Sequence, residues 1–106
     1  MESGNIFASL PEDLQNEVFD DLAKSDHVMV QRIVSWGQRS PEDFWYDQAT
    51  SEWVMVIKGR AQLMIEGDTC PITLAAGDYI NIPAGVRHRV HWTDPQQQTV
   101  WLAVHY

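Results

Sequence analysis

Residues 77–88 read Gly-Asp-Tyr-Ile-Asn-Ile-Pro-Ala-Gly-Val-Arg-His, and this stretch decides the fold of the chain. It passes from a turn glycine through a short apolar strand into a Pro-x-Gly turn, and it brings His88 onto the next strand. Glycine tolerates positive φ and proline fixes φ near about −65°, so Gly77, Pro83 and Gly85 constrain the backbone. A histidine so close behind a rigid turn has a well-defined position, which a metal ligand requires.

Strand-like runs extend on both sides of this stretch. They are short, rich in Val, Ile and aromatic residues, and separated by Gly, Pro and Asp turns. The predicted strands span residues 27–35, 52–58, 61–66, 72–74, 79–82, 87–92 and 99–105. Many short strands with closely spaced turns are typical of an antiparallel sandwich or barrel, so the predicted fold class is all-β.

The N-terminal part of the chain shows a different period. Ser9 can cap a helix, and the acidic residues Glu12 and Asp13 suit its positive N-terminal end. Apolar residues recur at four-residue steps: Leu10, Leu14, Val18 and Leu22. We therefore expect one amphipathic helix of roughly three turns. Residues 1–26 are predicted as a helical lead-in packed on the outside of a barrel formed by residues 27–106.

Size and charge restrict the function. A chain of 106 residues holds one domain, and its seven basic and fifteen acidic residues give a net charge of −8. This charge disfavours nucleic acid and anionic membrane surfaces as partners. The sequence shows neither a secretory signal nor an apolar run of about 18 residues, so we expect a cytoplasmic protein. The single cysteine, Cys70, cannot form an internal disulfide.

The opening stretch resembles the second motif of the cupin superfamily. That motif is a glycine, five residues, Pro-x-Gly, two residues, a histidine, three residues and an asparagine. Gly77, Pro83, Gly85 and His88 stand at these spacings, whereas Trp92 stands at the asparagine position. The resemblance implies a small cupin jelly-roll barrel, or double-stranded β-helix, with the predicted N-terminal helix outside it.

The first cupin motif is only half present. It contains His-x-His, three or four residues, a glutamate, six residues and a glycine. Glu52 and Gly59 fit, but the two histidines are missing. With four intervening residues their positions become Trp45 and Asp47, and with three they become Tyr46 and Gln48. The segments 44–48, 52–54 and 100–106 also resemble a group of short bacterial cupins.

The resemblance implies a divalent metal site, because metal-binding cupins hold Fe, Mn, Zn or Ni inside the barrel. Glu52 and His88 keep the family's ligand positions, and Asp47 is the best candidate for a third ligand. Tyr46 or Gln48 replaces Asp47 in the other spacing. Two carboxylates and one imidazole suit Mn or Fe, with Zn also compatible. The alternative is a metal-free pair in which Glu52 and His88 bind each other.

A small polar metabolite is the expected ligand, and the reaction is unspecified. The predicted pocket residues are Trp45, Tyr46, Gln48, Trp92 and His105. A non-catalytic sensor of a small molecule and a structural barrel without ligand are the competing functions. Two strands, at residues 53–57 and 101–104, are apolar on both faces, which favours burial of the outer face in a homodimer. Trp53, Met55 and Ile57, with Trp101 or Leu102, would form that interface.

Overall fold

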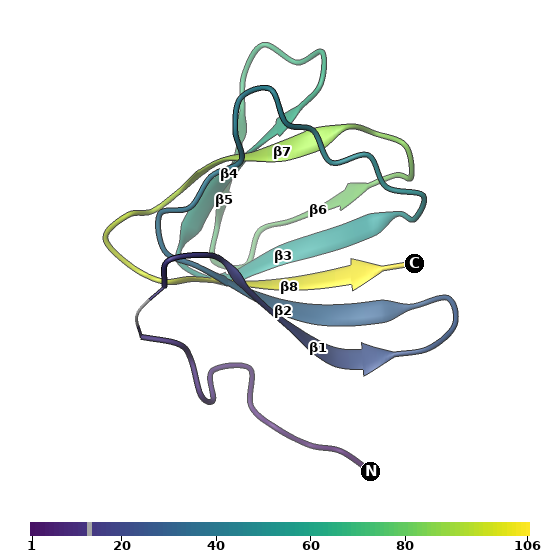
Figure 1. Cartoon of the computed structure of the whole chain (residues 1–106), viewed down its shortest axis with the longest axis vertical. Helices are drawn as coiled ribbons and strands as arrows, with labels where there is room; N and C mark the ends of the chain where they lie inside the picture. The colour runs from purple at the N-terminus through teal and green to yellow at the C-terminus, as the bar shows by residue number, and fades with distance from the viewer. Residues whose placement is uncertain (13) are drawn as a thin grey trace.

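The computed structural model of the protein describes residues 1–12 and 14–106, and its regular elements are eight antiparallel strands in two sheets (Figure 1). The larger sheet has the order β1-β2-β8-β3-β6 and the smaller one the order β5-β4-β7. The strands are β1 (Val18–Lys24), β2 (Met29–Ser35), β3 (Glu52–Lys58), β4 (Arg60–Ile65), β5 (Ile72–Ala75), β6 (Tyr79–Ile82), β7 (His88–Thr93) and β8 (Thr99–His105).

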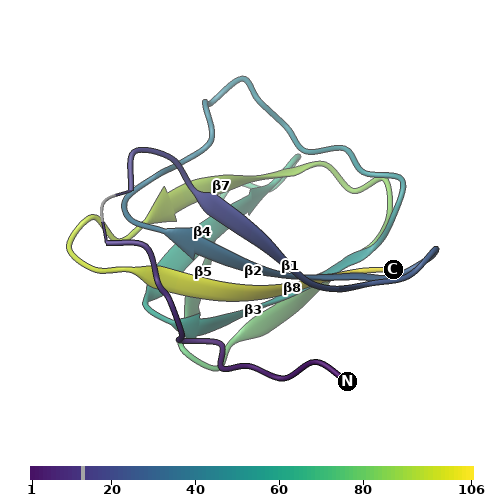
Figure 2. The same ribbon diagram turned by 60° about the horizontal axis from the view of Figure 1, so that its bottom comes forward.

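The two sheets face each other and enclose the core (Figure 2). Side chains alternate between the two faces of each strand, so every second residue points into the space between the sheets. The buried apolar cluster contains Val54, Val56, Ala61, Leu63, Leu74, Ile82, Trp101 and Ala103. It draws on β3, β4, β5, β6 and β8, which shows that both sheets build one common core. The all-β jelly-roll prediction is confirmed.

The predicted turn at residues 83–85 is present and places His88. The Val86 amide donates a hydrogen bond to the Pro83 carbonyl over 3.2 Å, which closes the turn. Gly85 has a φ of +80°, a value that residues with a side chain rarely adopt. The chain then enters β7, whose first residue is His88. The sequence prediction for this stretch is therefore correct in its local geometry.

The predicted N-terminal helix is wrong. Described residues contain no α-helix, and Val18–Lys24 form β1, which pairs with β2 from Val18↔Val34 to Lys24↔Met29. An isolated helix of about three turns is marginal in water, whereas β1 hydrogen-bonds along an otherwise open edge of the sheet. The pairing of β1 with β2 therefore determines the structure of this segment, although its apolar residues recur at the four-residue spacing of a helix. Asp13, also assigned to that helix, lies outside the described residues.

The lead-in nevertheless packs against the larger sheet, as predicted, but as an irregular segment. Arg32 of β2 donates hydrogen bonds from Nη1 to the carbonyls of Ile6 (3.1 Å) and Ala8 (2.6 Å). Its Nε and Nη2 contact Oδ2 of Asp20 on β1, at 3.2 and 2.9 Å. One arginine thus ties the N-terminal segment to the outer face of the sheet.

The outer face of β3 and β8 carries half-buried apolar side chains. Trp53, Met55 and Leu102 lie there, and the Trp53 ring packs against Tyr79 at 5.4 Å between centroids. Trp101 points the other way and is buried in the core. A homodimer through Trp53, Met55 and Ile57, with Leu102, remains a prediction. In the part of the chain that the structure describes, no helix is long and apolar enough to cross a membrane.

Candidate functional site

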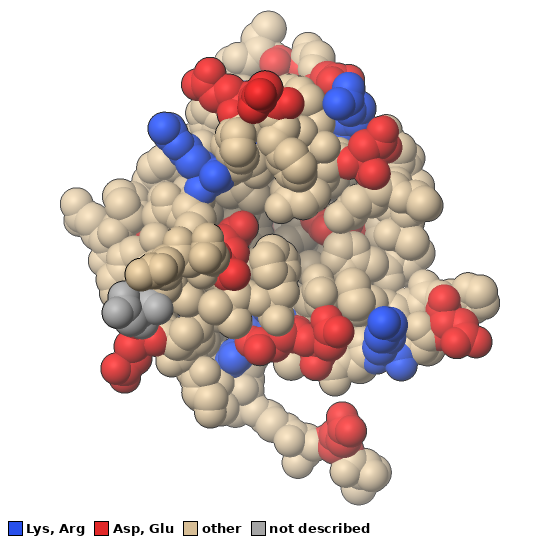
Figure 3. Space-filling view, in the orientation of Figure 1, with Lys and Arg blue, Asp and Glu red and all other residues tan. Residues whose placement is uncertain are grey.

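A cavity of about 120 Å³ lies between the sheets. Its polar lining consists of Glu17, Gln31, Tyr46, Gln48, Glu52, His88 and His105. Its apolar lining consists of Phe19, Ile33, Val54, Leu63, Val90 and Trp101. Figure 3 shows a recess near the centre of this face of the molecule, with acidic side chains at its edge. A space enclosed by apolar walls with a few polar groups is the usual form of a small-molecule site.

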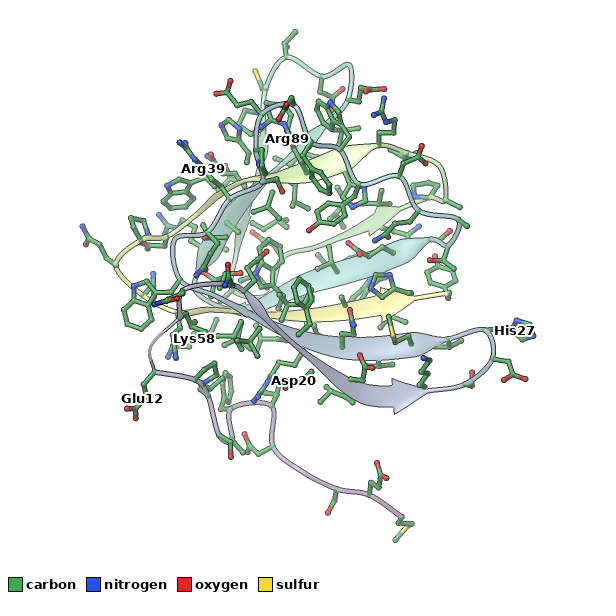
Figure 4. The ribbon with its side chains drawn as sticks, in the orientation of Figure 1. Glu12, Asp20, His27, Arg39, Lys58 and Arg89 are labelled. Atoms are coloured by element: carbon green, nitrogen blue, oxygen red, sulfur yellow. The ribbon has the colours of Figure 1, made fainter. Side chains whose placement is uncertain are left out.

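The cavity opens towards the β1–β2 hairpin. A wider groove of about 920 Å³ shares Phe19, Gln31, Gln48 and His105 with the cavity, so the two spaces are adjacent. Residues 24–29 of the hairpin form one side of this groove, and residues 48–50 form the other; the latter belong to the long loop between β2 and β3, residues 36–51. His27 is exposed at the tip of the hairpin, outside the inner cavity (Figure 4).

Three strands bring the central polar residues together. Glu52 on β3 is the register partner of His105 on β8, so the two side chains emerge next to each other on the same face. His88 comes from β7 in the opposite sheet. The backbones of Tyr46 and His88 exchange two hydrogen bonds of 2.7 and 3.1 Å, which fixes the long loop against the start of β7.

The Glu52 carboxylate lies between two imidazoles. Its Oε1 is 3.7 Å from Nε2 of His88, and its Oε2 is 3.5 Å from Nδ1 of His105. The side chains are largely buried, with exposed fractions of 14% for Glu52, 6% for His88 and 13% for His105. The sequence analysis identified Glu52 and His88 as a pair, and the structure adds His105 to them.

Hydrogen bonds on the outer side of each ring determine where the protons are. Nδ1 of His88 is 3.0 Å from the Val86 carbonyl, which can only accept, so this nitrogen carries a proton. Nε2 of His105 is 3.3 Å from Oε1 of Gln31, whose amide group donates to Asp21. Neutral His88 and His105 thus present bare nitrogens to the same carboxylate. An additional proton on either ring removes this repulsion.

The environment changes the pKa values of three cavity groups. Burial lowers the pKa of His88, but the Glu52 carboxylate and the Val86 carbonyl outweigh burial, so that its pKa is raised overall. Burial raises the pKa of Glu17, and the hydrogen bond from Ser35 only partly offsets this. Burial and the negative charges of Glu17 and Glu52 raise the pKa of Tyr46, which stays protonated. The site therefore combines a readily protonated histidine with a carboxyl group that resists ionisation.

Glu17 and its support were missed by the sequence analysis. The Ser35 hydroxyl, on fully buried Ser35, donates a hydrogen bond to Oε2 of Glu17 and accepts one of 3.0 Å from Nε1 of Trp101. Glu17 lies inside the segment that the four-residue period assigns to a helix. A carboxylate on a predicted surface helix gives no signal of a cavity, so its role depended on the pairing of β1 with β2.

The long loop places alternate residues in the cavity. Tyr46 and Gln48 line it, and the Tyr46 ring stacks on His88 with 5.6 Å between centroids. Oε1 of Gln48 is buried and has no hydrogen-bond partner among the described residues. Asp47 is exposed and absent from the cavity lining. The prediction of Asp47 as a ligand is therefore wrong. In an extended loop alternate side chains point in opposite directions, so Asp47 points outward while Tyr46 and Gln48 point into the cavity.

Two predicted pocket residues lie outside the cavity. Trp45 packs under the guanidinium of Arg89, 5.1 Å from the ring centroid, and Arg89 lines a surface pocket with Arg39 (Figure 4). Trp92 pairs with Gln62 on the outer face, because β7 has an extra residue between Val90 and Trp92 relative to β4. Such a β-bulge reverses the alternation, so Trp92 does not follow His88 and Val90 inward.

The residues present do not fit the expected metal centre. Cupins commonly bind a metal ion, and the predicted ligand set was Asp47, Glu52 and His88. With Asp47 outside, no group of three or more His, Cys, Asp or Glu side chains is placed to hold a metal ion anywhere in residues 1–12 and 14–106. The two imidazoles approach opposite oxygens of Glu52 instead of one common point.

Comparison with known proteins assigns the chain to the same family that its sequence motifs resemble. A model of the cupin domain matches residues 34–105, which includes every strand from β3 to β8. No curated protein matches the chain. Solved structures do, and one of them is similar over almost its whole length.

That structure is a protein of Ralstonia eutropha JMP134 described as a "putative mannose-6-phosphate isomerase". It is 47% identical, with a TM-score of 0.96 over 99% of this chain and 97% of that one. A cupin superfamily protein of Desulfitobacterium hafniense DCB-2 is 18% identical, with a TM-score of 0.78 over 99% and 91% of the two chains. An RmlC-like cupin of Methanocaldococcus jannaschii with a double-stranded β-helix fold is 20% identical, with a TM-score of 0.70 over 91% and 84%. The last two support the fold alone.

Proposed function

The chain belongs to the cupin domain family, and from this premise we propose that its cavity binds a small polar metabolite through Glu52, His88 and His105, which act as a proton-transfer group. The observation that carries this proposal is the Glu52 carboxylate between two imidazole nitrogens, 3.7 and 3.5 Å away, at the wall of the cavity. These distances are too long for strong hydrogen bonds, so the three side chains are not tied to one another, and each can turn its polar atom towards a hydroxyl or carbonyl group of a ligand in the cavity.

The three side chains can both donate and accept a proton. His88 is readily protonated because Glu52 raises its pKa, so it can act as a general acid towards a bound oxygen. Glu52 and neutral His105 face the same space and can act as bases. Val86 and Gln31 hold the outer nitrogens of the two rings, which keeps the reactive nitrogens directed inward. A proton shift between neighbouring atoms of a ligand is the reaction that this arrangement favours.

A sugar phosphate, the substrate class in the name of the Ralstonia protein, suits the inner cavity poorly. Its lining contains two carboxylates, Glu17 and Glu52, and neither lysine nor arginine among the described residues. A phosphate usually requires arginine, lysine or a helix N-terminus. We therefore propose that the ligand group bound in this cavity carries no phosphate.

Metal content is the first test of this function. Protein purified without an affinity tag and then incubated with Zn²⁺, Mn²⁺ or Fe²⁺ should retain less than about 0.1 equivalent after desalting, because its ligand set is incomplete. Elemental analysis measures this. Near-stoichiometric metal that is lost in both Glu52→Gln and His105→Ala, but kept in Asp47→Asn, would contradict the proposal and establish a metal site built on His105 in place of Asp47.

The protonation of His88 provides a second test. In Glu52→Gln the carboxylate charge is removed while burial remains, so we expect the pKa of His88 to fall below its wild-type value. Because the folded-state pKa is raised, the stabilisation from this pair is present below pH 6.5 and is lost as the pH rises through the folded-state pKa. An NMR titration of the imidazole resonances measures the shift.

The matched control for this titration is Glu66→Gln, which removes an exposed carboxylate that pairs with Arg87 on the surface. It should leave the His88 titration unchanged. Equal titration curves for wild type and Glu52→Gln would show that Glu52 and His88 are not coupled, and the proton-transfer group would then have to be abandoned.

Turnover separates an enzyme from a sensor within the same family. A ligand that raises the melting temperature and is recovered unaltered indicates a sensor, whereas a converted ligand indicates an enzyme. Homodimerisation and a cytoplasmic location remain predictions from the sequence.

A further inference from the structure

The charges and rings of the inner cavity restrict the ligand further. Two of its side chains are carboxylic acids, and no lysine or arginine accompanies them in the described lining. The His88 ring, when protonated, is matched by Glu52 at 3.7 Å. Glu17 has no cationic partner within 4.0 Å among the residues that the structure describes. The lining thus holds two carboxyl groups and two imidazoles, and both imidazoles contact Glu52, which leaves the Glu17 carboxyl group without a basic partner.

The uncharged polar atoms of the cavity also favour a ligand that donates hydrogen bonds. Oε1 of Gln48 is a buried acceptor without a partner in the described chain, and Nδ1 of neutral His105 is an acceptor as well. A ligand that brings hydrogen-bond donors satisfies both groups, whereas a ligand with only acceptors leaves them unpaired. An unpaired buried acceptor costs about 1–3 kcal/mol, so the donor count of the ligand matters.

Aromatic rings form much of the remaining wall. Phe19, Tyr46 and Trp101 contribute from β1, the long loop and β8. The faces of such rings attract a positive charge, by about 0.5–2 kcal/mol at each favourable contact. Carboxylates combined with aromatic faces are the usual surroundings of a bound organic ammonium group.

We infer that the inner cavity selects a small organic cation, with a protonated amine as the head group that reaches Glu17 and Glu52. This inference rests on the proposed function and specifies the charge of its ligand. The head group donates up to three hydrogen bonds, and the cavity offers the two carboxylates and Oε1 of Gln48 as acceptors. The rest of the ligand extends towards the groove beside the β1–β2 hairpin, which is adjacent to the cavity.

The state of Glu17 agrees with this inference. Burial raises the pKa of its carboxyl group, so ionisation is costly in the absence of a cation. A bound ammonium group supplies the missing opposite charge and favours the ionised form. The net charge of −8 for the whole chain also attracts cations to the groove.

Three probes of similar size and different charge test the inference: propylammonium, 1-propanol and propionate. Each is titrated at pH 7 up to about 50 mM, since ligands of four or five heavy atoms are limited to weak affinities. Binding is followed by the NMR signal of the Trp101 indole N–H, because Trp101 lines the cavity and its N–H bonds to Ser35, which in turn contacts Glu17. We expect propylammonium to bind at least about tenfold more tightly than 1-propanol, a difference of about 1.4 kcal/mol, and propionate not to bind.

Two variants assign the selectivity to the cavity. Glu17→Gln keeps the size of the side chain and should weaken propylammonium binding about tenfold while leaving 1-propanol unaffected. Glu66→Gln removes an exposed charge elsewhere and should change neither. Circular dichroism confirms that both variants are folded.

The possible outcomes separate this inference from the proposed function. Binding of 1-propanol or propionate with an affinity equal to or above that of propylammonium would overturn the cation preference but leave a small-molecule cavity. Cation binding that is unchanged in Glu17→Gln would also overturn it. If none of the three probes shifts the Trp101 signal, both the preference and the proposed small-molecule site are rejected.

Discussion

Replacing Gly59 with alanine is expected to reduce the free energy of unfolding by about 3 kcal/mol or more, and it can prevent folding altogether. Gly59 joins β3 to β4 with a φ of +93°. A Cβ atom there would lie 2.6 Å from the Gln98 carbonyl oxygen, 2.6 Å from Oγ1 of Thr99 and 2.7 Å from its Cα. Two of these atoms belong to the backbone at the start of β8, so no side-chain rotation can relieve the contact.

Thr99, the residue that a Cβ atom at position 59 would meet, is itself held in place by hydrogen bonds. Oγ1 of Thr99 lies 3.4 Å from the Arg60 amide and 3.2 Å from the Arg60 carbonyl, which locks the β3–β4 turn onto β8. Thr99 is fully buried. A displaced Thr99 would disturb the β3–β8 pairing that places Glu52 beside His105. Gly59→Ala should therefore damage the site together with the fold.

Gly67→Ala is the matched control for this prediction. Gly67 has the same φ of +93°, but a Cβ atom there would meet no other atom within 4 Å. Gly67→Ala should reduce the free energy of unfolding only by the strain of the left-handed conformation, about 1–2 kcal/mol. Urea unfolding of both variants isolates the contribution of the close approach to β8. Equal losses in the two variants would contradict the argument, since only the strain would then matter.

The glycine at position 59 illustrates which parts of the fold the sequence could predict. Its place in the first cupin motif, and the turns around Pro83 and Gly85, are local signals, and the strands between such turns were identified within one or two residues. The prediction for the segment before residue 27 was wrong because its structure depends on a distant partner. The four-residue period is a local signal, but β2 offers hydrogen bonds that a short helix cannot match.

In the candidate site, too, the residues fixed by local signals could be predicted, and those fixed by long-range pairing could not. Glu52 and His88 could be predicted because their spacing from turn glycines determines where they point. Asp47 could not be separated from its neighbours, since one step along an extended loop exchanges the inner and outer faces. His105 required the register of β8 against β3, and Trp92 required the bulge in β7. Each of these depends on pairing between distant segments.

Replacing Arg32 with alanine is the second change for which we expect a large effect, a loss of about 2 kcal/mol in the free energy of unfolding, because charge-assisted hydrogen bonds are lost while the Asp20 side chain is 41% exposed and can be solvated. Arg32 is 8% exposed, and its guanidinium group donates hydrogen bonds to Asp20 and to the Ile6 and Ala8 carbonyls. The variant leaves both carbonyls without their donor and the Asp20 carboxylate without its partner. The N-terminal segment should then detach from the sheet.

Limited proteolysis detects that detachment directly. Cleavage within residues 1–12 should become much faster in Arg32→Ala than in the wild type, at a temperature where both are folded. The control is Arg87→Ala, which removes a surface pair with Glu66 whose side chains are 44% and 45% exposed. Such exposed pairs contribute about 0.2–1 kcal/mol, so this variant should keep both its stability and its resistance to cleavage.

The edge strand β1 links this prediction to the site. Asp20 on β1 receives Arg32 on the outer face, while Phe19, its neighbour in the chain, lines the cavity from the inner face. Loss of Arg32 should loosen β1 and with it the position of Glu17 just before the strand. Arg32→Ala should therefore also weaken propylammonium binding, although Arg32 does not touch the cavity. Unchanged binding in a destabilised Arg32→Ala variant would show that β1 keeps its place without this arginine.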